Sequence, residues 1–272
     1  MSDACSWIGS RTGWVCAAVV ACSAAVAMSG ARGGGAWLHE VEISEPAEPK
    51  KVACGEMGVP SDAKVLLAAH ASDAKEWNML GGKPARWKVT DGVMVVEPGS
   101  GNVRSGFEFG DCQLHIEFRT PSPASGEGQN RGNSGVYLHG KYEVQVLDSF
   151  GDGAESKTYA DGQCGAIYKV SPPLVNVSKA PGEWQTYDIV FTAPKFDAAG
   201  KKTSSARLTV LHNGVLIQHD VEVKGPTGAA AGGEEMAMGP LMLQDHGSKV
   251  EYRNIWVRNI GTDASAGHTQ GK

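Results

Sequence analysis

Short runs of strand-forming residues alternate with turn residues along most of this chain, and this cadence constrains the fold more than any other feature. Helical periodicity is almost absent between the runs. The runs cover residues 87–96, 112–120, 135–147, 164–170, 184–192, 206–223 and 240–259. Strands at this spacing are typical of an all-β sandwich or jelly roll with two antiparallel sheets.

Two dipeptides predict where the chain reverses direction. Asn213-Gly214 lies between two apolar runs, and this pair favours a type I′ turn because both central residues need a positive φ. Asp91-Gly92 separates two shorter apolar runs in the same way. We therefore expect a hairpin at each site. Residues 227–239 are rich in Gly and Ala and predict a mobile surface loop.

The first residues have the composition of an export signal. Arg11 precedes an apolar stretch at residues 14–28, which is too short to cross a bilayer comfortably, and small residues follow up to Ala31. This predicts cleavage between Ala27 and Ala31, no integral membrane span, and a periplasmic or extracellular protein. Cys22 gives an alternative, a lipoprotein cleavage site.

The remaining chain divides into three predicted parts. Residues 32–64 are rich in Gly, Glu and Pro and predict a flexible linker after the signal peptide of residues 1–31. Residues 65–260 carry the unbroken strand cadence and predict one jelly-roll domain. Residues 261–272 predict a disordered tail.

Charge and cysteine content exclude several classes of protein. The chain of 272 residues has a formal net charge of −5 and no nucleic-acid-binding motif, so nucleic acid is not an expected partner. Outside the leader only Cys54, Cys112 and Cys164 remain, with no metal-ligand spacing, and these predict buried or half-buried side chains rather than a disulfide framework. The sequence gives no indication of the oligomeric state.

One strand has polar side chains on a complete face. From residue 141 to residue 147, Tyr142, Val144 and Val146 share one face, whereas Glu143 and Gln145 lie on the other. The preceding loop supplies Arg131 and Asn133, and Asp148 follows. Guanidinium, amide and carboxyl groups gathered in this way predict a carbohydrate site.

Two further segments add polar candidates. Glu117 and Arg119 alternate with apolar residues and are expected to join Glu143 and Gln145 on a concave face; the alternative is an ordinary solvated sheet face. Near the end of the domain Gln244 and His246 share a face, and Arg253 follows. His246 could be a base, a metal ligand, a hydrogen-bond partner of a sugar, or an ordinary polar residue at the surface. Asp245 is expected to form a turn before Gly247. Trp184 and Trp256 lie in apolar strand contexts, so both are expected in the core.

The spacing of Glu143 and Asp148 is similar to the E-x-D-x-x-E pattern of laminarinase-like glycosidases. In that pattern a β-bulge lets two carboxylates face one cleft. Here the middle acid is replaced by Gln145 and the last is the shorter Asp148. These two changes do not favour a double displacement by two carboxylates about 5 Å apart. The alternative for Glu143 is a structural ion pair with Arg119 or Arg131.

A set of motifs in order carries a wider resemblance. These are Arg131-Gly-Asn-Ser-Gly-Val-Tyr-Leu, Tyr142-Glu-Val-Gln-Val-Leu-Asp-Ser, Gly165-Ala-Ile-Tyr, Gly182-Glu-Trp-Gln-Thr-Tyr-Asp, His212-Asn-Gly-Val, Leu243-Gln-Asp-His-Gly and Tyr252-Arg-Asn-Ile-Trp. Together they resemble the bacterial 3-keto-disaccharide hydrolase domain family over residues 65–260. The resemblance implies a concanavalin A-like jelly roll that acts on glycosides already oxidised at C3.

That reaction needs one base rather than paired carboxylates. A ketone at C3 acidifies the C2 hydrogen, so a single base can remove it while a cation or hydrogen-bond donor stabilises the enolate. Elimination of the C1 group and addition of water then complete a net hydrolysis. The catalytic candidates are Glu143, His246 and Asp148, with Glu143 or His246 as the base. Arg131 or a divalent metal is the expected electrophile, and no other cofactor is indicated.

The remaining polar candidates would bind substrate. Asn133, Gln145, Tyr168 and Gln244 are placed to orient hydroxyl groups, and Glu117, Arg119 and Arg253 are further contacts. Two other functions stay open. One is a noncatalytic carbohydrate-binding module with the same fold, and the other is a retaining glucanase-like glycosidase.

Overall fold

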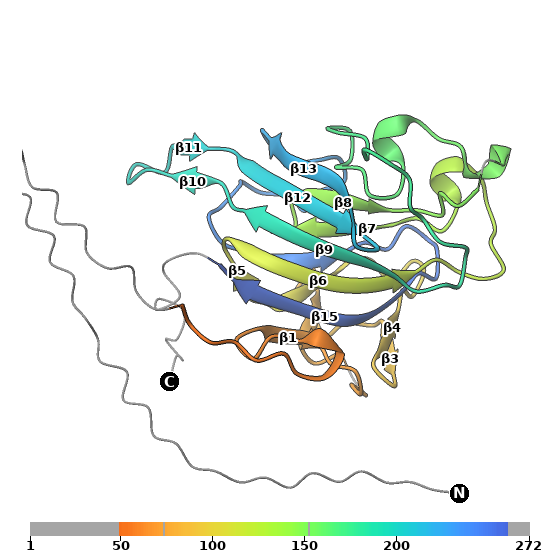
Figure 1. Ribbon diagram of the computed structural model, residues 1–272, viewed down its shortest axis with the longest axis horizontal. Helices are drawn as coiled ribbons and strands as arrows, with labels where there is room; N and C mark the ends of the chain where they lie inside the picture. Colours follow the sequence, from red (N-terminus) through yellow and green to blue (C-terminus); the bar gives the residue numbers. More distant parts are fainter. Residues whose placement is uncertain (1–48, 73, 152, 261–272) are drawn as a thin grey trace, which may run out of the picture. The chain divides into compact units, whose positions relative to one another are not determined.

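The computed structural model describes residues 49–72, 74–151 and 153–260, and within them the secondary structure is almost entirely β (Figure 1). The larger sheet runs in the order β13(Val215–Val223), β12(Ala206–His212), β9(Gln185–Thr192), β6(Cys112–Arg119), β15(Glu251–Asn259), β4(Val93–Val95) and β3(Lys88–Thr90), with β1(Lys64–Leu67) also paired to β15. The second sheet runs β2(Trp77–Met79), β5(Val103–Phe109), β14(Gly239–Leu243), β7(Ser134–Leu138) and β8(Tyr142–Val146). Within both sheets the paired strands are antiparallel.

A few short elements complete the described chain. A small ribbon pairs β10(Lys195–Phe196) with β11(Lys202–Ser204). The helical segments are single 3-10 turns: η1(Glu56–Gly58), η2(Gly128–Asn130), η3(Ala154–Ser156) and η4(Ala160–Gly162). In the part of the chain described here, no helix has the length and apolarity needed to cross a membrane. The expected antiparallel jelly-roll sandwich is confirmed.

Alternating side chains build the core between the two sheets. Leu114, Ile116 and Phe118 of β6 are fully buried, as are Tyr142 and Val144 of β8. Full burial of a large apolar side chain stabilises a fold by about 1.5–3 kcal/mol. The intervening residues of each strand therefore point away from the core, on opposite outer faces of the sandwich.

Both predicted hairpins are present. Asn213 and Gly214 have φ values of 51° and 79° between β12 and β13. Asp91 and Gly92, between β3 and β4, have φ values of 48° and 75°. A Cβ at Gly92 would lie 2.0 Å from the backbone oxygen of Ala69, so only glycine fits this turn.

The strand expected at residues 164–170 is wrong. Gly165 and Lys169 have φ values of 81° and 59°, which are incompatible with a continuous strand. Instead Ile167 forms isolated bridges with Val144 and Ser171. The segment follows the free edge of β8, where the Tyr168 amide donates to the Glu143 carbonyl at 3.2 Å.

The end of the predicted linker contacts the sandwich. Asp62 accepts a hydrogen bond from Arg258 of β15 at 2.9 Å and pairs with Lys50 at 3.2 Å. Cys54 forms a β-bridge with Pro60. The structure thus differs from the expectation of a flexible linker over residues 50–64. The predicted signal peptide, with the Cys22 alternative, and the tail at residues 261–272 lie outside the described residues.

Cys54, Cys112 and Cys164 are free. Cys112 and Cys164 are buried as expected, whereas Cys54 is exposed.

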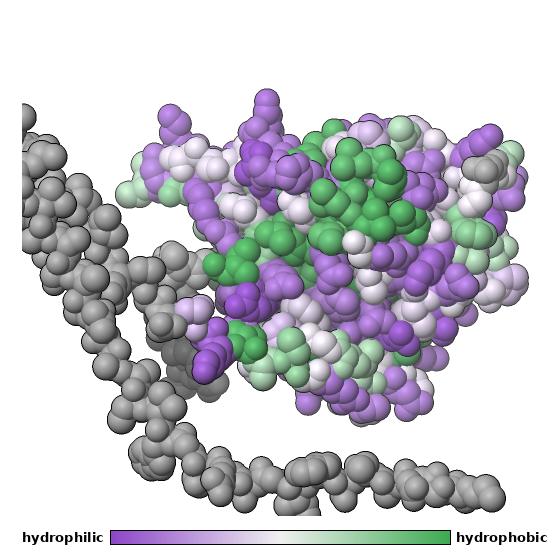
Figure 2. Space-filling model, viewed as in Figure 1, coloured by the Kyte–Doolittle hydropathy of each residue, from purple (hydrophilic) through white to green (hydrophobic). Residues whose placement is uncertain are grey.

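Apolar side chains gather on one outer face, over β13 and the loop that lies along it (Figure 2). The exposed ones there include Leu174, Val175, Val215 and Leu216.

Candidate functional site

The outer face of the five-stranded sheet carries a polar pocket. Antiparallel pairing of β7 with β8 places Gly135 opposite Gln145 and Tyr137 opposite Glu143. Met242 of β14 pairs with Tyr137 on the other side. A pocket of about 100 Å³ opens on this face. It is lined by Gln129, Asn133, Glu143, Gln145, Tyr168, Ala229, Gln244 and His246.

Glu143 is the buried acid of this pocket, with 2% of its surface exposed. Burial disfavours the carboxylate and, against an opposing hydrogen bond from Tyr137, raises the pKa of Glu143 to about 8. The same burial, with the nearby Glu143 carboxyl, raises the pKa of the Tyr137 phenol above its usual value. A carboxyl with such a pKa is suited to exchange protons near neutral pH.

Gly135 makes room for this acid. A Cβ at this position would lie 2.5 Å from Glu143 Oε1 and 2.6 Å from Tyr137 Cε2. Side chains do not approach that closely, so a larger residue would displace the carboxyl or the phenol. The glycine in β7 therefore lets Glu143 and Tyr137 fold over the strand.

Three amides in the pocket have their nitrogens engaged and their oxygens free. Asn133 Nδ2 donates to the backbone oxygen of Gln129 at 2.7 Å, and Gln145 Nε2 donates to Gln129 Oε1 at 3.0 Å. Gln244 Nε2 donates to the Tyr137 hydroxyl at 3.1 Å. The oxygens Asn133 Oδ1, Gln145 Oε1 and Gln244 Oε1 are buried and accept no hydrogen bond within the described protein.

This arrangement favours a ligand that donates hydrogen bonds. A buried acceptor without a partner costs about 1–3 kcal/mol, and a bound ligand can recover that energy. Gln129 fixes the orientation of the amides because its own Nε2 donates to the Gly162 carbonyl at 2.8 Å. The hydroxyl groups of a sugar match such a set of acceptors.

The loop after β13 forms one wall of the pocket. Lys141 donates to the backbone oxygens of Ala231, Gly232 and Gly233 at 2.6, 2.8 and 2.9 Å. Thr227 Oγ1 accepts from the Glu143 amide at 3.1 Å. The loop predicted as a mobile surface loop is thus tied to the turn between β7 and β8.

Tyr168 and His246 stand at the rim. The hydroxyls of Tyr168 and Tyr159 share a hydrogen bond at 2.6 Å. His246 is exposed and follows Asp245, which accepts from the Gly247 amide at 3.0 Å as expected for a turn former. Both rim residues carry groups that can donate a hydrogen bond to a ligand in the pocket.

Asp148 does not join Glu143. Its carboxyl is buried and lies 2.7 Å from Arg131 Nε, and it lines a neighbouring pocket instead. Arg131 also donates to the Gly126 carbonyl at 3.2 Å. The two residues expected as acid and electrophile are therefore paired with each other, and Glu143 has neither Arg131 nor Arg119 as an ion-pair partner.

The expectation that Glu117 and Arg119 join the Glu143 face is wrong, and Arg253, expected as a further substrate contact, lies beside them. They lie on the larger sheet, and their face points away from the core that separates the two sheets. Arg253 Nε donates to Glu117 Oε2 at 2.6 Å, and Arg119 Nε donates to Glu251 Oε2 at 2.7 Å. Ordinary cross-strand ion pairs, the alternative considered for this face, describe it better.

A histidine strengthens that outer cluster. Burial opposes protonation of His115, but the hydrogen bond to Asp188 at 2.7 Å and the nearby Glu117 carboxylate outweigh it and raise the pKa of His115 to about 9. Burial likewise opposes the Glu117 carboxylate, yet its partners lower the pKa of Glu117 to about 2.

Both tryptophans belong to this outer face. Trp256 is buried against the His115 ring, with centroids 5.3 Å apart. Trp184 is only half-buried, and the guanidinium of Arg253 lies 4.0 Å from its ring. The expectation of a core position is therefore wrong for Trp184.

The ligand types available for a metal are limited. Among the described residues, no group of three or more His, Cys, Asp and Glu side chains could hold an ion. Glu143, His246 and the three free amide oxygens are the donors that the pocket offers. The carboxyl and amide oxygens are ligands of the kind that hard cations prefer, whereas the His246 ring offers a nitrogen.

Sequence reasoning missed two residues that shape the pocket. Gln129 orders the amides, and Tyr137 contacts both Glu143 and Gln244. The sequence could have indicated Tyr137, because it lies two residues after Gly135 and therefore on the same face of the strand. In a hairpin with the next strand it pairs with Glu143. Gln129 lies in a Gly-rich loop, where no periodicity marks it.

Solved structures of candidate glycosyl hydrolases share this fold. One from Parabacteroides distasonis ATCC 8503 is 39% identical, covers 82% of this chain and 96% of its own, and has a TM-score of 0.72. Another from the same organism is 21% identical, covers 73% of this chain and 99% of its own, and has a TM-score of 0.51, which shows the fold alone. No curated protein matches the chain significantly.

Fold and pocket together define a carbohydrate-active domain of the glycosyl hydrolase-like class. The sequence profile of the 3-keto-alpha-glucoside-1,2-lyase-like domain matches residues 63–258. The chain belongs to this 3-keto-disaccharide hydrolase domain family, which confirms the resemblance of the motifs.

Proposed function

We propose that this protein is an exported enzyme that cleaves 3-keto-glycosides by elimination and hydration. The observation that carries the proposal is Glu143, a buried acid with a pKa raised to about 8 in a pocket whose described lining contains no second carboxylate. A retaining glycosidase needs two carboxyl groups about 5 Å apart. An elimination next to a ketone needs one base.

The first step moves one proton. The Glu143 carboxylate takes the C2 proton of the keto-sugar, and the C2–H electrons form an enolate whose charge rests on the C3 oxygen. Most amide nitrogens of the pocket are already engaged, so the donors for that oxygen are the Tyr168 hydroxyl and the His246 ring at the rim. Donors aimed at a developing oxyanion contribute strongly to catalysis.

The second step releases the C1 group. The enolate electrons form the C1–C2 double bond as the C1–O bond breaks, and the leaving oxygen takes a proton from water or a rim residue. Water then adds at C1 and returns a proton to the group that protonated the leaving oxygen. Glu143, after its proton has exchanged with solvent, protonates C2. The free oxygens of Asn133, Gln145 and Gln244 would accept sugar hydroxyls throughout and hold C2 toward Glu143.

Proton exchange at C2 tests this mechanism. We expect the purified protein to convert 3-keto-trehalose in deuterated water to products with deuterium at C2, and to leave unoxidised trehalose intact. Glu143→Gln should reduce turnover about 100-fold or more, the usual contribution of a positioned base. His246→Ala tests the alternative base, and unchanged rates in both variants would exclude both residues.

Other functions give different results. A glucanase would cleave unoxidised glucan and lose most activity in both Glu143→Gln and Asp148→Asn. A binding module would hold sugar without converting either substrate. Products without deuterium at C2 would exclude proton abstraction with solvent exchange.

Export is the second part of the proposal, and the leader up to Ala31 supports it. Mass spectrometry of the protein from its native host should find a new N-terminus between residues 27 and 32. A diacylglyceryl group on Cys22 would favour the lipoprotein alternative, and an intact Met1 or Ser2 would contradict export.

A further inference from the structure

Tyr168, at the rim of the Glu143 pocket, contacts two side chains that do not line the pocket. Its hydroxyl shares a hydrogen bond with the Tyr159 hydroxyl at 2.6 Å, and Lys169 Nζ lies 3.2 Å from the centre of the Tyr159 ring. We infer that Tyr159 and Lys169 are positioning residues that direct the Tyr168 hydroxyl proton into the pocket. The inference rests on the proposed function and deepens it, because it identifies what orients the donor for the enolate oxygen.

The direction of the shared hydrogen bond decides what Tyr168 offers to a ligand. A phenol has one proton to donate. If Tyr168 gives this proton to Tyr159, it presents only an acceptor to the pocket. If Tyr159 is the donor, the Tyr168 proton is free for a ligand. Among the described residues, the Tyr168 hydroxyl has no hydrogen-bond partner except Tyr159, so this one contact sets the outcome.

The ammonium group of Lys169 favours Tyr159 as the donor. A cation over an aromatic face attracts the π electrons, and a ring with less electron density makes its hydroxyl a stronger donor and a weaker acceptor. Lys169 Nζ lies 3.2 Å from the centre of the Tyr159 ring but 6.0 Å from the centre of the Tyr168 ring, so the effect is greater on Tyr159. Tyr168 then accepts from Tyr159 and donates its own proton more strongly, because hydrogen bonds in a chain polarise one another.

The backbone between Tyr159 and Lys169 holds the cation over the ring. A Cβ at Gly162 would overlap Tyr159 Cε2, so the glycine lets the ring fold back over the η4 turn. Lys169 has a left-handed φ of 59°, and its amide donates to the Asp161 carbonyl at 2.9 Å. Asp161 Oδ1 also lies 3.4 Å from Lys169 Nζ. These contacts join the two ends of the segment and place the ammonium group against the phenol.

The Tyr168 ring is held between two neighbours. A Cβ at Gly228 would lie 3.1 Å from Tyr168 Cε1, so the loop after β13 packs against one side of the ring. The Tyr159 ring meets the Tyr168 ring edge to face, with centroids 6.2 Å apart. With the ring held in this way, rotation of the hydroxyl proton is the freedom that the Tyr159 hydrogen bond restricts.

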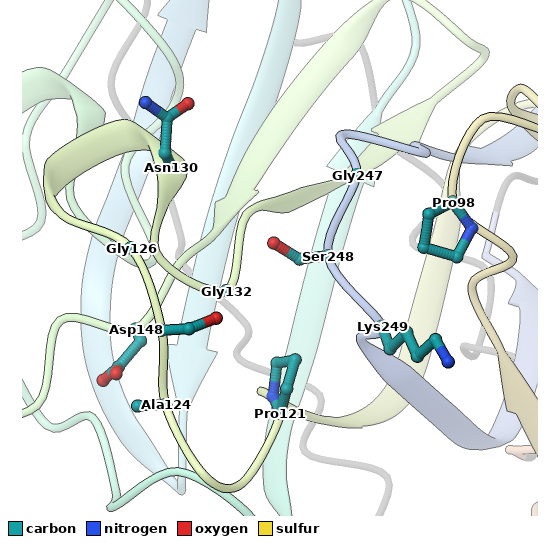
Figure 3. Close-up of a pocket in the computed structure, with 11 residues that line it drawn as sticks. Pro98, Pro121, Ala124, Gly126, Asn130, Gly132, Asp148, Gly247, Ser248 and Lys249 are labelled. Carbon is teal, nitrogen blue, oxygen red and sulfur yellow. The ribbon is translucent and has the colours of Figure 1, made fainter.

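The Glu143 pocket needs such an indirect source of positive charge. Its described lining contains no Lys or Arg. Arg131 is paired with Asp148, and both Asp148 and Lys249 line the neighbouring pocket of about 330 Å³ (Figure 3). Lys169 instead acts on the pocket through two phenols. A cation directly beside Glu143 would favour the carboxylate and weaken it as a base, whereas a neutral phenol can support the enolate without that effect.

Variants of Lys169 separate its charge from its packing. Lys169→Met removes the charge and keeps an apolar stem, whereas Lys169→Arg keeps a cation that can stack on the Tyr159 ring. With 3-keto-trehalose, we expect Lys169→Met to lower kcat about fivefold and Tyr159→Phe about tenfold, with KM within about twofold, because the effect belongs to the transition state. Lys169→Arg should keep kcat within about twofold of the wild type. Lys157→Met, which removes an equal charge at an exposed position nearby, is the matched control.

Neutron diffraction from crystals grown in deuterated water separates this inference from the proposed function, because it locates hydroxyl deuterium without any turnover. In the wild type, the deuterium of the shared bond should lie on the Tyr159 oxygen, and the deuterium of Tyr168 should point into the pocket. That result supports the inference even if no keto-sugar is converted. A Tyr168 deuterium that points at Tyr159 would overturn it. So would unchanged kcat in Lys169→Met, a loss that Lys169→Arg does not restore, an equal loss in Lys157→Met, or a change confined to KM.

Discussion

The carboxyl of Glu143 and the phenol of Tyr137 lie on neighbouring strands and are joined by a hydrogen bond that the phenol donates. Their backbones pair directly in the β7–β8 hairpin. Tyr137 also accepts a hydrogen bond from Gln244 at 3.1 Å. The base, its phenol and one substrate-binding amide thus form a single connected unit, so a change in one member alters the others.

The pH dependence of kcat/KM should report Glu143. Its pKa is raised to about 8, and only the carboxylate can take a proton, so kcat/KM should rise with pH and reach half its maximum near pH 8. The Tyr137 hydrogen bond lowers this pKa, so Tyr137→Phe should move the midpoint to higher pH. A pH series of initial rates from 6 to 9.5 measures both midpoints. A midpoint that stays unchanged in Tyr137→Phe would contradict the assignment.

The same group should make the fold less stable at high pH. In the unfolded chain Glu143 ionises near its ordinary pKa of 4.5, whereas in the folded protein it ionises near 8. Stability therefore falls as pH rises from 4.5 to 8. The Glu143→Gln variant has no carboxyl to ionise and lacks this loss. Its free energy of unfolding should exceed that of the wild type by a few kcal/mol at pH 9, with little difference at pH 5. Chemical denaturation at both pH values measures it, with exposed Glu183→Gln as the control.

A single methyl group at Gly135 should disable the site. The Cβ of Gly135→Ala would lie 2.5 Å from Glu143 Oε1, so the carboxyl must move. We expect kcat to fall about 100-fold, because displacement of a base by about 1 Å has effects of that size. Gly106→Ala on β5 is the matched control, since its Cβ finds no atom closer than 3.6 Å. Crystal structures of both variants would show whether the carboxyl moves, and full activity in Gly135→Ala would refute the expectation.

Local patterns predicted the strands better than the surfaces they form. Alternation located β6 and β8 and separated Glu143 from Tyr142, because the period of two belongs to each strand. Alternation cannot tell which sheet a strand joins. Glu117 and Glu143 both stand on polar faces, yet these faces point in opposite directions because β6 and β8 lie in different sheets. Long-range pairing decides that relationship.

The candidate site shows the same limit. Asn133, Gln145, Tyr168, Gln244 and His246 line one pocket with Glu143, as the motifs indicated. Asp148 follows the same strand, but its pairing with Arg131 directs it to the neighbouring pocket. A contact between a loop and a strand end leaves no periodic trace in the sequence.

The outer cluster around His115 should contribute stability but not activity. The pKa of His115 is about 9 in the folded protein, above its ordinary value of 6.5. The stabilisation that the protonated His115 ring provides is therefore complete below pH 6.5 and is lost as pH rises through 9. His115→Gln should therefore cost on the order of 2–3 kcal/mol at pH 6 and much less at pH 10. Denaturant titrations at the two pH values measure the change. A loss of kcat/KM in the folded variant would instead link this face to the substrate.

Lys141 should position the loop that walls the Glu143 pocket. Its ammonium is buried and binds three consecutive carbonyl oxygens, those of Ala231, Gly232 and Gly233. Lys141→Met keeps the length and apolar stem of the side chain but leaves these carbonyls without their donor. Hydrogen bonds to charged groups contribute about 1.5–3 kcal/mol each, so the loop should detach from the β7–β8 turn.

Detachment should affect binding more than chemistry. Ala229 lines the pocket, whereas Glu143 remains fixed by β8, so KM for a keto-glycoside should rise about 10-fold or more while kcat changes less. Lys201→Met, at an exposed turn, is the matched control and should match the wild type. Hydrogen exchange of residues 227–233 gives a readout independent of catalysis, because lost hydrogen bonds accelerate it. Unchanged exchange together with an unchanged KM would show that other contacts hold the loop without Lys141.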